Sequence, residues 1–332
     1  MLLVPISEAS QVGEARRQAA NTAEKAGFAV ADAGRAAIVA TELATNIIKH
    51  GGGGDVLIGA YETPDGSGIE ILALDRGPGI ANLQACLVDG YSSAGTAGNG
   101  LGAIFRQSHL VEVVSWPGLG TAFLARFEPG TPPRHKKVAT AQWGAVCVAM
   151  PGEEVSGDAW TVDETADVRT LLVADGLGHG PDAGEAAVQA IRVFHRHKGH
   201  QPATILDYIH GGLRSTRGAA VSLARMDKTS RKLVYAGIGN VAGAIVAEDG
   251  IRRMVSLAGT AGHNARKVHS FEYSFSGGIV VMHSDGLSSS WKFDRYPGLS
   301  RAHPTLAAAV LFRDFWRRRD DVTVLISRGA SP

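Results

Sequence analysis

Hydrophobic and polar residues follow two different periods along the first 127 residues of the chain. Leu2–Ile6 predicts a strand, and Ser7 is placed to cap a helix that continues to about Ala26. A second helix is predicted over 32–50, because apolar residues recur there every third or fourth position up to Gly51. Four predicted strands follow, at 55–61, 69–75, 111–116 and 121–127. Helices followed by a mixed sheet predict a two-layer α/β sandwich.

Strand patterns dominate the second half of the chain. Seven strands are predicted, at 145–149, 169–175, 219–226, 232–238, 242–247, 279–284 and 322–327. Three helices fit 182–197, 204–216 and 305–318. Packed sheets flanked by helices account for this pattern, so the fold class of the whole chain is α/β (α+β).

A segment rich in proline separates the two halves. Residues 128–137 hold three prolines and one glycine, which can continue neither a helix nor a central strand. We therefore predict two domains, 1–127 and 138–332, joined by a linker over 128–137.

Composition narrows the possible partners. The 332 residues are 45% hydrophobic and 20% charged, and their net charge of +1 gives no long-range attraction to nucleic acid or to an anionic membrane. The basic clusters at 134–137 and 317–319 are interpreted as solvated surface. No apolar run approaches the roughly 18–20 residues of a membrane span, and Cys86 and Cys147 fall one in each predicted domain. We expect a cytoplasmic protein that binds neither nucleic acid nor membrane.

Polar residues share one face of the predicted helix over 32–50. Glu42, Asn46 and Lys49 recur at helical spacing, away from the apolar stripe. The amide oxygen of Asn46 suits Mg²⁺, and Glu42 is placed to orient or deprotonate a nucleophile. An ordinary amphipathic surface helix is the alternative interpretation.

The next candidate site residue lies at the end of a predicted strand. Asp75 in the sequence Asp-Arg-Gly-Pro-Gly can accept a hydrogen bond from an adenine amino group, while Gly77 and Gly79 allow the backbone to approach the base. A simple Gly-Pro turn would need no aspartate. The glycine-rich segment 95–102 precedes a helical stretch, so its amides can face phosphates. Together the three segments predict an ATP site.

Four acidic positions in the second half lie at strand ends or turns. They are Asp158, Asp175, Asp285 and Asp320. Hard divalent ions prefer carboxylate oxygens, and two such ions sharing an aspartate can activate water for attack on phosphorus. A glycine after an aspartate permits a tight turn and lets a backbone carbonyl join the metal ligands. A single Asp-Gly is usually only a turn, as we expect at Asp65 and Asp249, but four acidic positions predict a two-metal phosphatase.

The first half resembles the GHKL ATPase superfamily. Glu42–His50 is similar to its N box, Asp75–Gly79 to its first glycine box, and Gly98–Gly102 to its second. Within the superfamily, the segment from Asp75 to Gly95 is most similar to RsbT-type serine kinases of partner-switching pathways. The resemblance implies ATP with Mg²⁺, catalytic Glu42, Mg²⁺-binding Asn46, and nucleotide contacts from these residues: Asp75, Gly77, Gly79, Gly98, Gly100 and Gly102. Histidine kinases share the fold but need a preceding pair of dimerisation helices, so we expect a serine kinase.

The second half resembles the metal-dependent (PPM, type 2C) protein phosphatases in their SpoIIE/RsbX branch. The similar motifs are Ser156–Asp158, Asp175–Gly180, Ser284–Gly286 and Asp320–Thr323. The resemblance implies two Mn²⁺ or Mg²⁺ ions and hydrolysis of phosphoserine and phosphothreonine. It makes Asp175 the catalytic bridging ligand, with Gly176 lending its carbonyl and Asp158, Asp285 and Asp320 completing the set. The phosphate-binding arginine of larger members has no clear counterpart.

Several other polar residues have two interpretations. His179 either orients water or is structural, and His283 is expected to be a packed core histidine. The histidines within 195–200 are interpreted as solvated surface rather than a metal site. Ser92 and Ser93 are expected in the ATP lid.

The resemblances predict a bifunctional regulator, a protein serine kinase and a phosphatase that act on one STAS-domain antagonist, with other partner-switch components as further partners. The alternative is an ATP-dependent docking module that binds a partner and controls the attached phosphatase without kinase activity.

Overall fold

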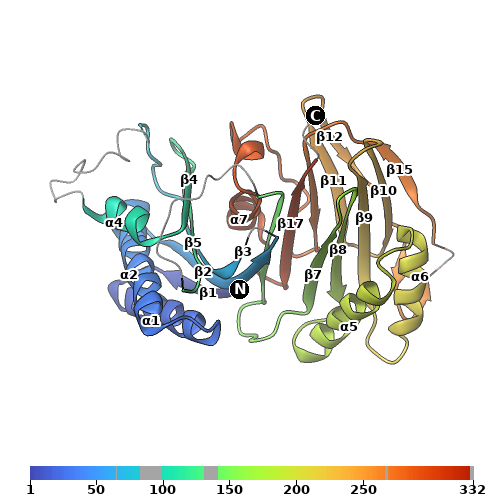
Figure 1. The fold of residues 1–332 in the computed structure, drawn as a ribbon, viewed down its shortest axis with the longest axis horizontal. Coiled ribbons are helices and arrows are strands. Elements are labelled where there is room, and N and C mark those ends of the chain that lie inside the picture. Colours follow the sequence, from blue (N-terminus) through green and yellow to red (C-terminus); the bar gives the residue numbers. More distant parts are fainter. Residues whose placement is uncertain (65, 83–98, 131–140, 266–267, 330–332) are drawn as a thin grey trace. The chain divides into compact units, whose positions relative to one another are not determined.

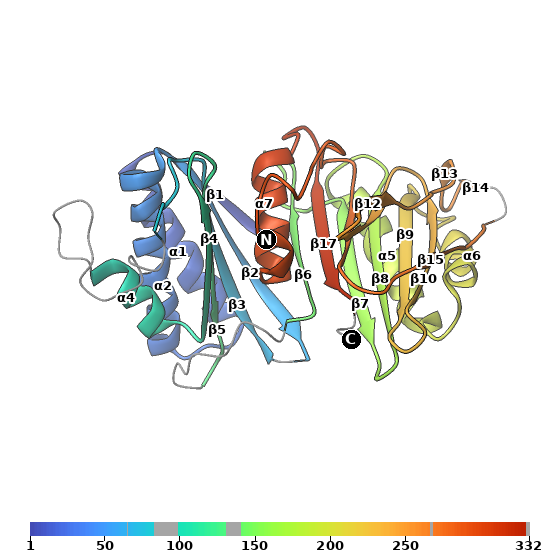
Figure 2. The ribbon, with the colours of Figure 1, turned by 90° about the horizontal axis from the view of Figure 1, so that it is seen from above.

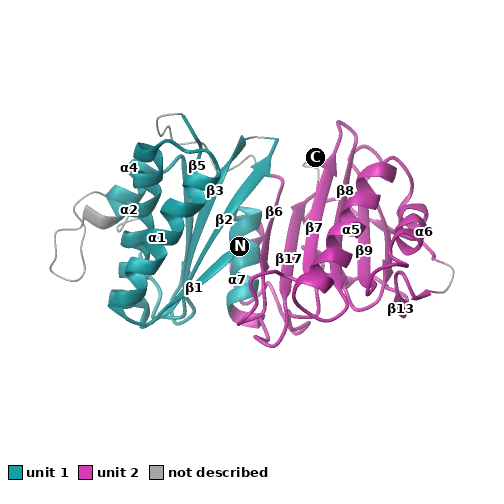
Figure 3. Ribbon diagram, turned by 90° about the horizontal axis from the view of Figure 1, so that it is seen from below, with its two compact units in different colours: residues 1–141, 301–313 teal, residues 142–300, 314–332 magenta. Residues whose placement is uncertain are grey.

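The chain divides into two compact units. The computed structural model describes residues 1–64, 66–82, 99–130, 141–265 and 268–329. Unit 1 comprises Met1–Ala141 and Arg301–Arg313, and unit 2 comprises Gln142–Ser300 and Asp314–Pro332 (Figure 3). Residues 301–313 therefore group with unit 1, although the sequence placed them inside the second predicted domain. The predicted domain limits themselves stay predictions.

Unit 1 contains a five-stranded sheet with helices on both faces. Its strand order is β1-β2-β3-β5-β4, and every neighbouring pair of strands is antiparallel. The prediction of a mixed sheet was therefore wrong. The strands are β1 (Leu2–Ile6), β2 (Gly54–Thr63), β3 (Gly66–Asp75), β4 (Leu110–Trp116) and β5 (Gly120–Phe127). The helices are α1 (Ala9–Lys25), α2 (Val30–Asn46), α4 (Asn99–Gln107) and α7 (Pro304–Phe315).

Two helix ends differ from the prediction. The N-cap of α1 is Glu8 rather than Ser7, because Gln11 and Glu8 form a reciprocal capping box. The predicted helix over 32–50 starts at Val30 and ends at Asn46, and one π-helical turn, Ile47–Gly51, follows it. A left-handed Gly52 then ends the turn.

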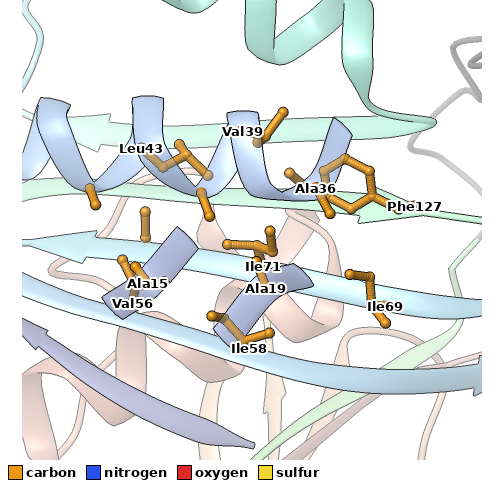
Figure 4. Close-up of a cluster of buried hydrophobic side chains, with 14 of the residues drawn as sticks. Ala15, Ala19, Ala36, Val39, Leu43, Val56, Ile58, Ile69, Ile71 and Phe127 are labelled. Atoms are coloured by element: carbon orange, nitrogen blue, oxygen red, sulfur yellow. The ribbon is translucent and has the colours of Figure 1, made fainter. Parts of the chain in front are cut away.

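The core of unit 1 lies between the sheet and helices α1 and α2 (Figure 4). Alanines on both helices face this core, and side chains this small let two helices pack closely together and against the strands. The labelled residues are Ala15, Ala19, Ala36, Val39, Leu43, Val56, Ile58, Ile69, Ile71 and Phe127. Because strand side chains alternate, neighbours such as Leu57, Leu72 and Leu124 face the opposite side, and they too are buried. Helix α7 lies on that opposite side (Figure 2).

Unit 2 is a sandwich of two antiparallel five-stranded sheets, as predicted in outline. One sheet has the order β15-β10-β9-β8-β7 and the other β12-β11-β16-β17-β6 (Figure 1). The first sheet contains β7 (Asp158–Glu164), β8 (Val168–Gly176), β9 (Ala219–Asp227), β10 (Lys232–Ile238) and β15 (Phe271–Ser274). The second contains β6 (Trp143–Val148), β11 (Ala242–Ala247), β12 (Gly250–Arg253), β16 (Ile279–His283) and β17 (Val322–Arg328). A short ladder joins β13 (Gly259–Thr260) to β14 (Asn264–Ala265).

Apolar side chains from both sheets form the inner core of unit 2. Leu171, Tyr235, Met282 and Leu325 belong to it. The helices α5 (Pro181–His197) and α6 (Pro202–Gly212) pack on the outer face of the first sheet through a second cluster. The seven predicted strands are all present, but β7, β12, β13, β14 and β15 were not predicted. No helix in the part of the chain described is long and apolar enough to cross a membrane.

Candidate functional site

The predicted nucleotide residues of unit 1 lie on neighbouring elements. Glu42 and Asn46 are one turn apart on α2, and both are partly exposed. The π-turn after Asn46 brings Gly51 against Asp75, where a Cβ on Gly51 would lie 2.5 Å from the Asp75 Cβ. The fold thus places the end of α2 beside the strand end that carries Asp75.

The carboxylate of Asp75 is held by backbone amides at the end of β3. Its Oδ1 accepts hydrogen bonds from Gly77 N at 2.8 Å and from Thr121 N at 3.2 Å. Both of these hydrogen bonds go to Oδ1, and Oδ2 accepts none from the described part of the chain. Burial raises the pKa of Asp75, opposed by these two amides and by the charges of Arg313 and His50. The result is a fixed carboxylate with one oxygen available to an N–H donor such as an adenine amino group.

The predicted glycines next to Asp75 allow backbone segments to meet. At Gly79 φ is +71°, and a Cβ would lie 2.1 Å from Trp116 O. A Cβ on Gly77 would lie 2.7 Å from the Gly51 Cα. Close packing of the protein against itself therefore explains both glycines.

Part of the predicted phosphate loop lies outside the described residues. Gly98 is among these, as are the predicted lid residues Ser92 and Ser93. Gly100 and Gly102 lie in the first turn of α4, which begins at Asn99.

The unpredicted strand β7 explains how Asp158 reaches the second candidate site. Asp158 is the first residue of β7 and stands directly opposite Asp175 in the β7–β8 ladder. Asp285 follows β16 after Ser284, and Asp320 precedes β17 by one residue. The edge strand β7, its neighbour β8 and the segments next to β16 and β17 thus bring together acidic residues that are far apart in sequence.

The pKa values of these four carboxyls show that they repel one another. Burial raises the pKa of Asp175 to about 9, and the charges of Asp158, Asp285 and Asp320 add to the effect. Burial likewise raises the pKa of Asp158 to about 7. The pKa values of Asp285 and Asp320 are raised too, mainly by burial. Such a cluster is stable as four carboxylates only when cations offset their charge.

Three further residues that sequence reasoning missed orient the acidic cluster. Ser284 Oγ donates to Asp158 Oδ2 at 2.6 Å, and Asn240 donates its amide to Asp285. Asp321 accepts from Met150 N and Gly157 N, both at 2.8 Å, and so holds the segment that leads into Asp158. Asp321 is therefore a structural clamp. Only the position of Ser284 and Asp321 beside predicted ligands hinted at these roles.

Close backbone packing explains the glycines after Asp175 and Asp285. Asp285 and Gly286 do lie in a turn, as predicted, in which Leu287 N donates to Ser284 O at 3.3 Å. A Cβ on Gly176 would lie 2.0 Å from Ala183 O, and one on Gly286 would lie 1.9 Å from Asp321 O. Neither glycine has a positive φ. Close approach of another backbone segment, and not left-handed geometry, requires a glycine at both positions.

The donor chemistry of this cluster fits hard divalent ions. Carboxylate and carbonyl oxygens are the ligands that Mg²⁺ and Mn²⁺ prefer. Within the described ranges, no three His, Cys, Asp or Glu side chains are already arranged to hold a metal ion. What supports metal binding is thus the uncompensated charge of the cluster and not a completed set of ligands.

The remaining candidates fall into surface and core roles. His283 is buried and donates from Nδ1 to Ser284 O, while its Nε2 accepts from Trp291 Nε1, so it is the expected core histidine. Burial lowers the pKa of His283 to about 4, which keeps it neutral. His179 is exposed and contacts Glu153 at 2.7 Å. In the 195–200 cluster, His197 stacks on Tyr208, as expected for a surface cluster.

One cation lies near the acidic cluster. Arg317 is exposed, and its backbone N–H donates to Gly286 O at 2.9 Å. Its charge opposes the burial that raises the pKa of Asp285. The sequence had placed this arginine in a solvated surface cluster, and the structure adds that it stands beside Asp285.

Comparison with protein families assigns a different family to each half of the chain. Residues 6–122 match the family of histidine kinase-like ATPase domains, and residues 167–329 match the family of stage II sporulation protein E. The serine/threonine-protein kinase RsbT of Bacillus subtilis is 33% identical over 111 residues, which are 33% of this chain and 84% of RsbT.

Solved structures are similar to a little more than half of the chain. A structure from the bacterial stressosome, described as a modular system adapted to control secondary messenger signalling, has a TM-score of 0.53 and 29% identity. The match covers 57% of this chain and all of that chain. RsbX in complex with magnesium matches with a TM-score of 0.50 and 18% identity, covering 58% of this chain and 97% of that chain, and shows the same fold.

Proposed function

This chain belongs to the RsbT-type histidine kinase-like ATPases and carries a SpoIIE-type phosphatase domain of the PPM class, and we propose that it both phosphorylates and dephosphorylates a protein partner. The observation that carries the proposal is that one polypeptide holds a fixed adenine-type acceptor, Asp75, and a separate cluster of four mutually repelling aspartates. The first suits nucleotide binding and the second suits phosphate hydrolysis.

In the kinase half, each residue has one task. Asp75 Oδ2 would accept a hydrogen bond from the adenine amino group, and Asn46 would hold the Mg²⁺ that accompanies ATP. Glu42 accepts the proton of a substrate serine while the serine oxygen bonds to the γ-phosphorus. The bond from that phosphorus to the bridging oxygen breaks, and ADP leaves. Gly100 and Gly102 would place backbone amides beside the phosphates, and Gly98, predicted to do the same, lies outside the described residues.

In the phosphatase half, Asp158, Asp175, Asp285 and Asp320 would hold two Mn²⁺ or Mg²⁺ ions, with the carbonyl of Gly176. Bound ions of this kind supply Lewis-acid activation of water and of the phosphate. The residues around them fix the ligands in place. Ser284 orients Asp158 and Asn240 orients Asp285.

Arg317 is the residue we propose for contact with the substrate phosphate. Its guanidinium is exposed and stands beside Asp285. It would thus supply the arginine that the sequence motifs lacked.

We propose a STAS-domain antagonist as the shared substrate. Two similarities support a protein substrate in a signalling system: RsbT is a serine/threonine-protein kinase, and the similar solved structure comes from the bacterial stressosome, a system that controls secondary messenger signalling. The proposed site of action is the cytoplasm, with Mg²⁺-ATP and Mn²⁺ or Mg²⁺ as cofactors. A docking module that binds the partner with ATP but transfers no phosphate is the competing hypothesis.

Intact-mass spectrometry of a candidate STAS partner, incubated with the full chain, ATP and Mn²⁺, separates these hypotheses. The wild-type protein should consume ATP while the partner stays unphosphorylated. Asp175→Asn should let phosphate accumulate on the partner, and Asn46→Ala should leave only removal of phosphate. The double variant Asp175→Asn with Glu42→Ala is the control, and it should transfer nothing. An Asp175→Asn protein that binds the partner more tightly with ATP but never phosphorylates it would establish the docking module instead.

A further inference from the structure

A buried arginine from the second half of the sequence contacts the nucleotide residues of unit 1. Arg313 lies on α7, is 2% exposed, and belongs to unit 1 together with the rest of 301–313. Its Nη1 donates to Asp75 O at 2.7 Å and is 3.5 Å from Thr121 O. In sequence, however, α7 lies between Asp285 and Asp320, two of the predicted metal ligands of unit 2.

Arg313 acts at the point where β3 and β5 hold the Asp75 carboxylate. Thr121 N is one of the two donors to Asp75 Oδ1. Arg313 contacts the backbone carbonyl oxygens of these same two residues, Asp75 and Thr121. The space around Asp75 O is otherwise closed, because a Cβ on Gly120 would lie 2.1 Å from it. A buried guanidinium stays charged and must donate its N–H groups, so this contact has a strong physical cause. The same positive charge favours the ionised form of Asp75.

The rest of α7 is attached to the same sheet. Arg126 Nη2 on β5 donates to Thr305 Oγ1 at 3.1 Å, and Arg126 also pairs with Glu70 on β3 at 2.8 Å. The backbone N–H of His303 donates to the Glu112 carboxylate on β4 at 3.0 Å. These contacts attach the N-terminal end of α7 to the sheet, and Arg313 lies near the other end of the same helix.

We propose that Arg313 is a positioning residue of the nucleotide site, which holds the backbone of Asp75 and Thr121 so that the Asp75 carboxylate meets the adenine amino group. The inference rests on the proposed binding of ATP by unit 1. It means that the sequence between two predicted metal ligands of the phosphatase also completes the ATP site.

Calorimetry with ATP and with inosine triphosphate, on the full chain, tests this role. The hypoxanthine base of inosine triphosphate has no amino group that could donate a hydrogen bond to Asp75. The wild-type protein should therefore bind ATP more tightly than inosine triphosphate. Arg313→Met should weaken ATP binding by about tenfold, the scale of one hydrogen bond to a charged group, and should leave the inosine nucleotide unaffected. Arg313→Lys keeps the charge and one donor and should recover part of the preference. Thr305→Val is the matched control, because it removes a contact of α7 far from Asp75 and should keep the preference.

Each outcome decides the matter. An unchanged preference for ATP in Arg313→Met, an equal loss for both nucleotides, or a loss in Thr305→Val as large as in Arg313→Met would overturn the positioning role. If Arg313→Met does not fold, Arg313→Lys decides, since full wild-type preference in that variant would overturn the role and a reduced preference would support it. A wild-type protein that binds no ATP would instead refute the ATP-binding half of the proposed function.

Discussion

The two candidate sites differ in how the negative charge of their carboxylates is compensated. In unit 1, the single carboxylate of Asp75 is held by two backbone amides and lies near Arg313, so its geometry is set before any ligand arrives. In unit 2, the pKa values of four aspartates, one buried and three partly buried, are all raised, and the nearby cation Arg317 only partly offsets this effect at Asp285. The first site is preorganised for a neutral N–H donor, and the second is stabilised by added cations.

Removing one carboxylate from unit 2 should have the largest effect. Asp175→Asn should abolish metal-dependent hydrolysis of a phosphopeptide, because the proposed bridging ligand is lost, and should leave ATP affinity unchanged. The same change should raise the melting temperature of the metal-free protein, since folding no longer has to pay for a carboxyl whose pKa is raised to about 9. Thermal unfolding in a chelator and a phosphate-release assay with Mn²⁺ measure the two effects.

Asp249→Asn is the matched control for this variant. Asp249 also precedes a glycine, but it is exposed and lies in a turn. This change should alter neither activity nor stability. Full Mn²⁺-dependent turnover by Asp175→Asn would contradict the assignment of the acidic cluster.

An aspartate-to-asparagine change in unit 1, Asp75→Asn, should change only the affinity for ATP. In Asp75→Asn, the amide oxygen must take the place of Oδ1, because Gly77 N and Thr121 N donate there. The amide NH₂ then faces the adenine amino group, and two donors meet. A lost hydrogen bond to a charged group is worth about 1.5–3 kcal/mol, or about ten- to a hundredfold in ATP affinity. Calorimetry that finds equal affinity would make Asp75 a turn residue only.

The comparison also predicts a pH dependence of stability that arises from the acidic cluster of unit 2, with a smaller effect. The folded-state pKa of Asp175 is raised to about 9 and that of Asp158 to about 7. A carboxyl with a raised folded-state pKa contributes stability at low pH and loses it as pH rises through that value. The metal-free protein should therefore melt at a lower temperature at pH 9 than at pH 5. Each 1 kcal/mol corresponds to about 2–4 °C for a unit of this size.

Metal should reverse this trend, because metal ions compete with protons for the same oxygens. Melting curves with Mn²⁺ and with a chelator, from pH 5 to pH 9, measure both trends. Asp175→Asn should flatten the metal-free curve. A metal-free wild-type protein whose melting temperature rises steadily over this range would show that the four aspartates do not repel one another in solution.

Much of the fold followed from local sequence. The apolar stripe of α2 and the alternating strands of unit 2 are signals that come from neighbouring residues, so both were predicted with small errors at the ends. Strand β7 was missed because its sequence, Asp-Ala-Trp-Thr-Val-Asp-Glu, is half polar, and pairing with β8 stabilises it. The tight turn predicted at Asp285 is present, but the reason for the glycines after Asp175 and Asp285 was missed, because close approach of a distant backbone is invisible in sequence.

The sequence by itself determined which chemistries the chain carries. Two patterns carried this information: aspartates beside glycines, and an acidic and an amide residue one helical turn apart. Both are local, so they can be recognised without knowledge of the fold. Only the tertiary structure decided which distant residues support these sites. Three contacts depend on packing between segments up to 238 residues apart. They are the hydrogen bonds from Ser284 to Asp158, from Gly157 N to Asp321, and from Arg313 to Asp75 O. Such contacts arise because burial forces each polar group to find a partner wherever the chain brings one near.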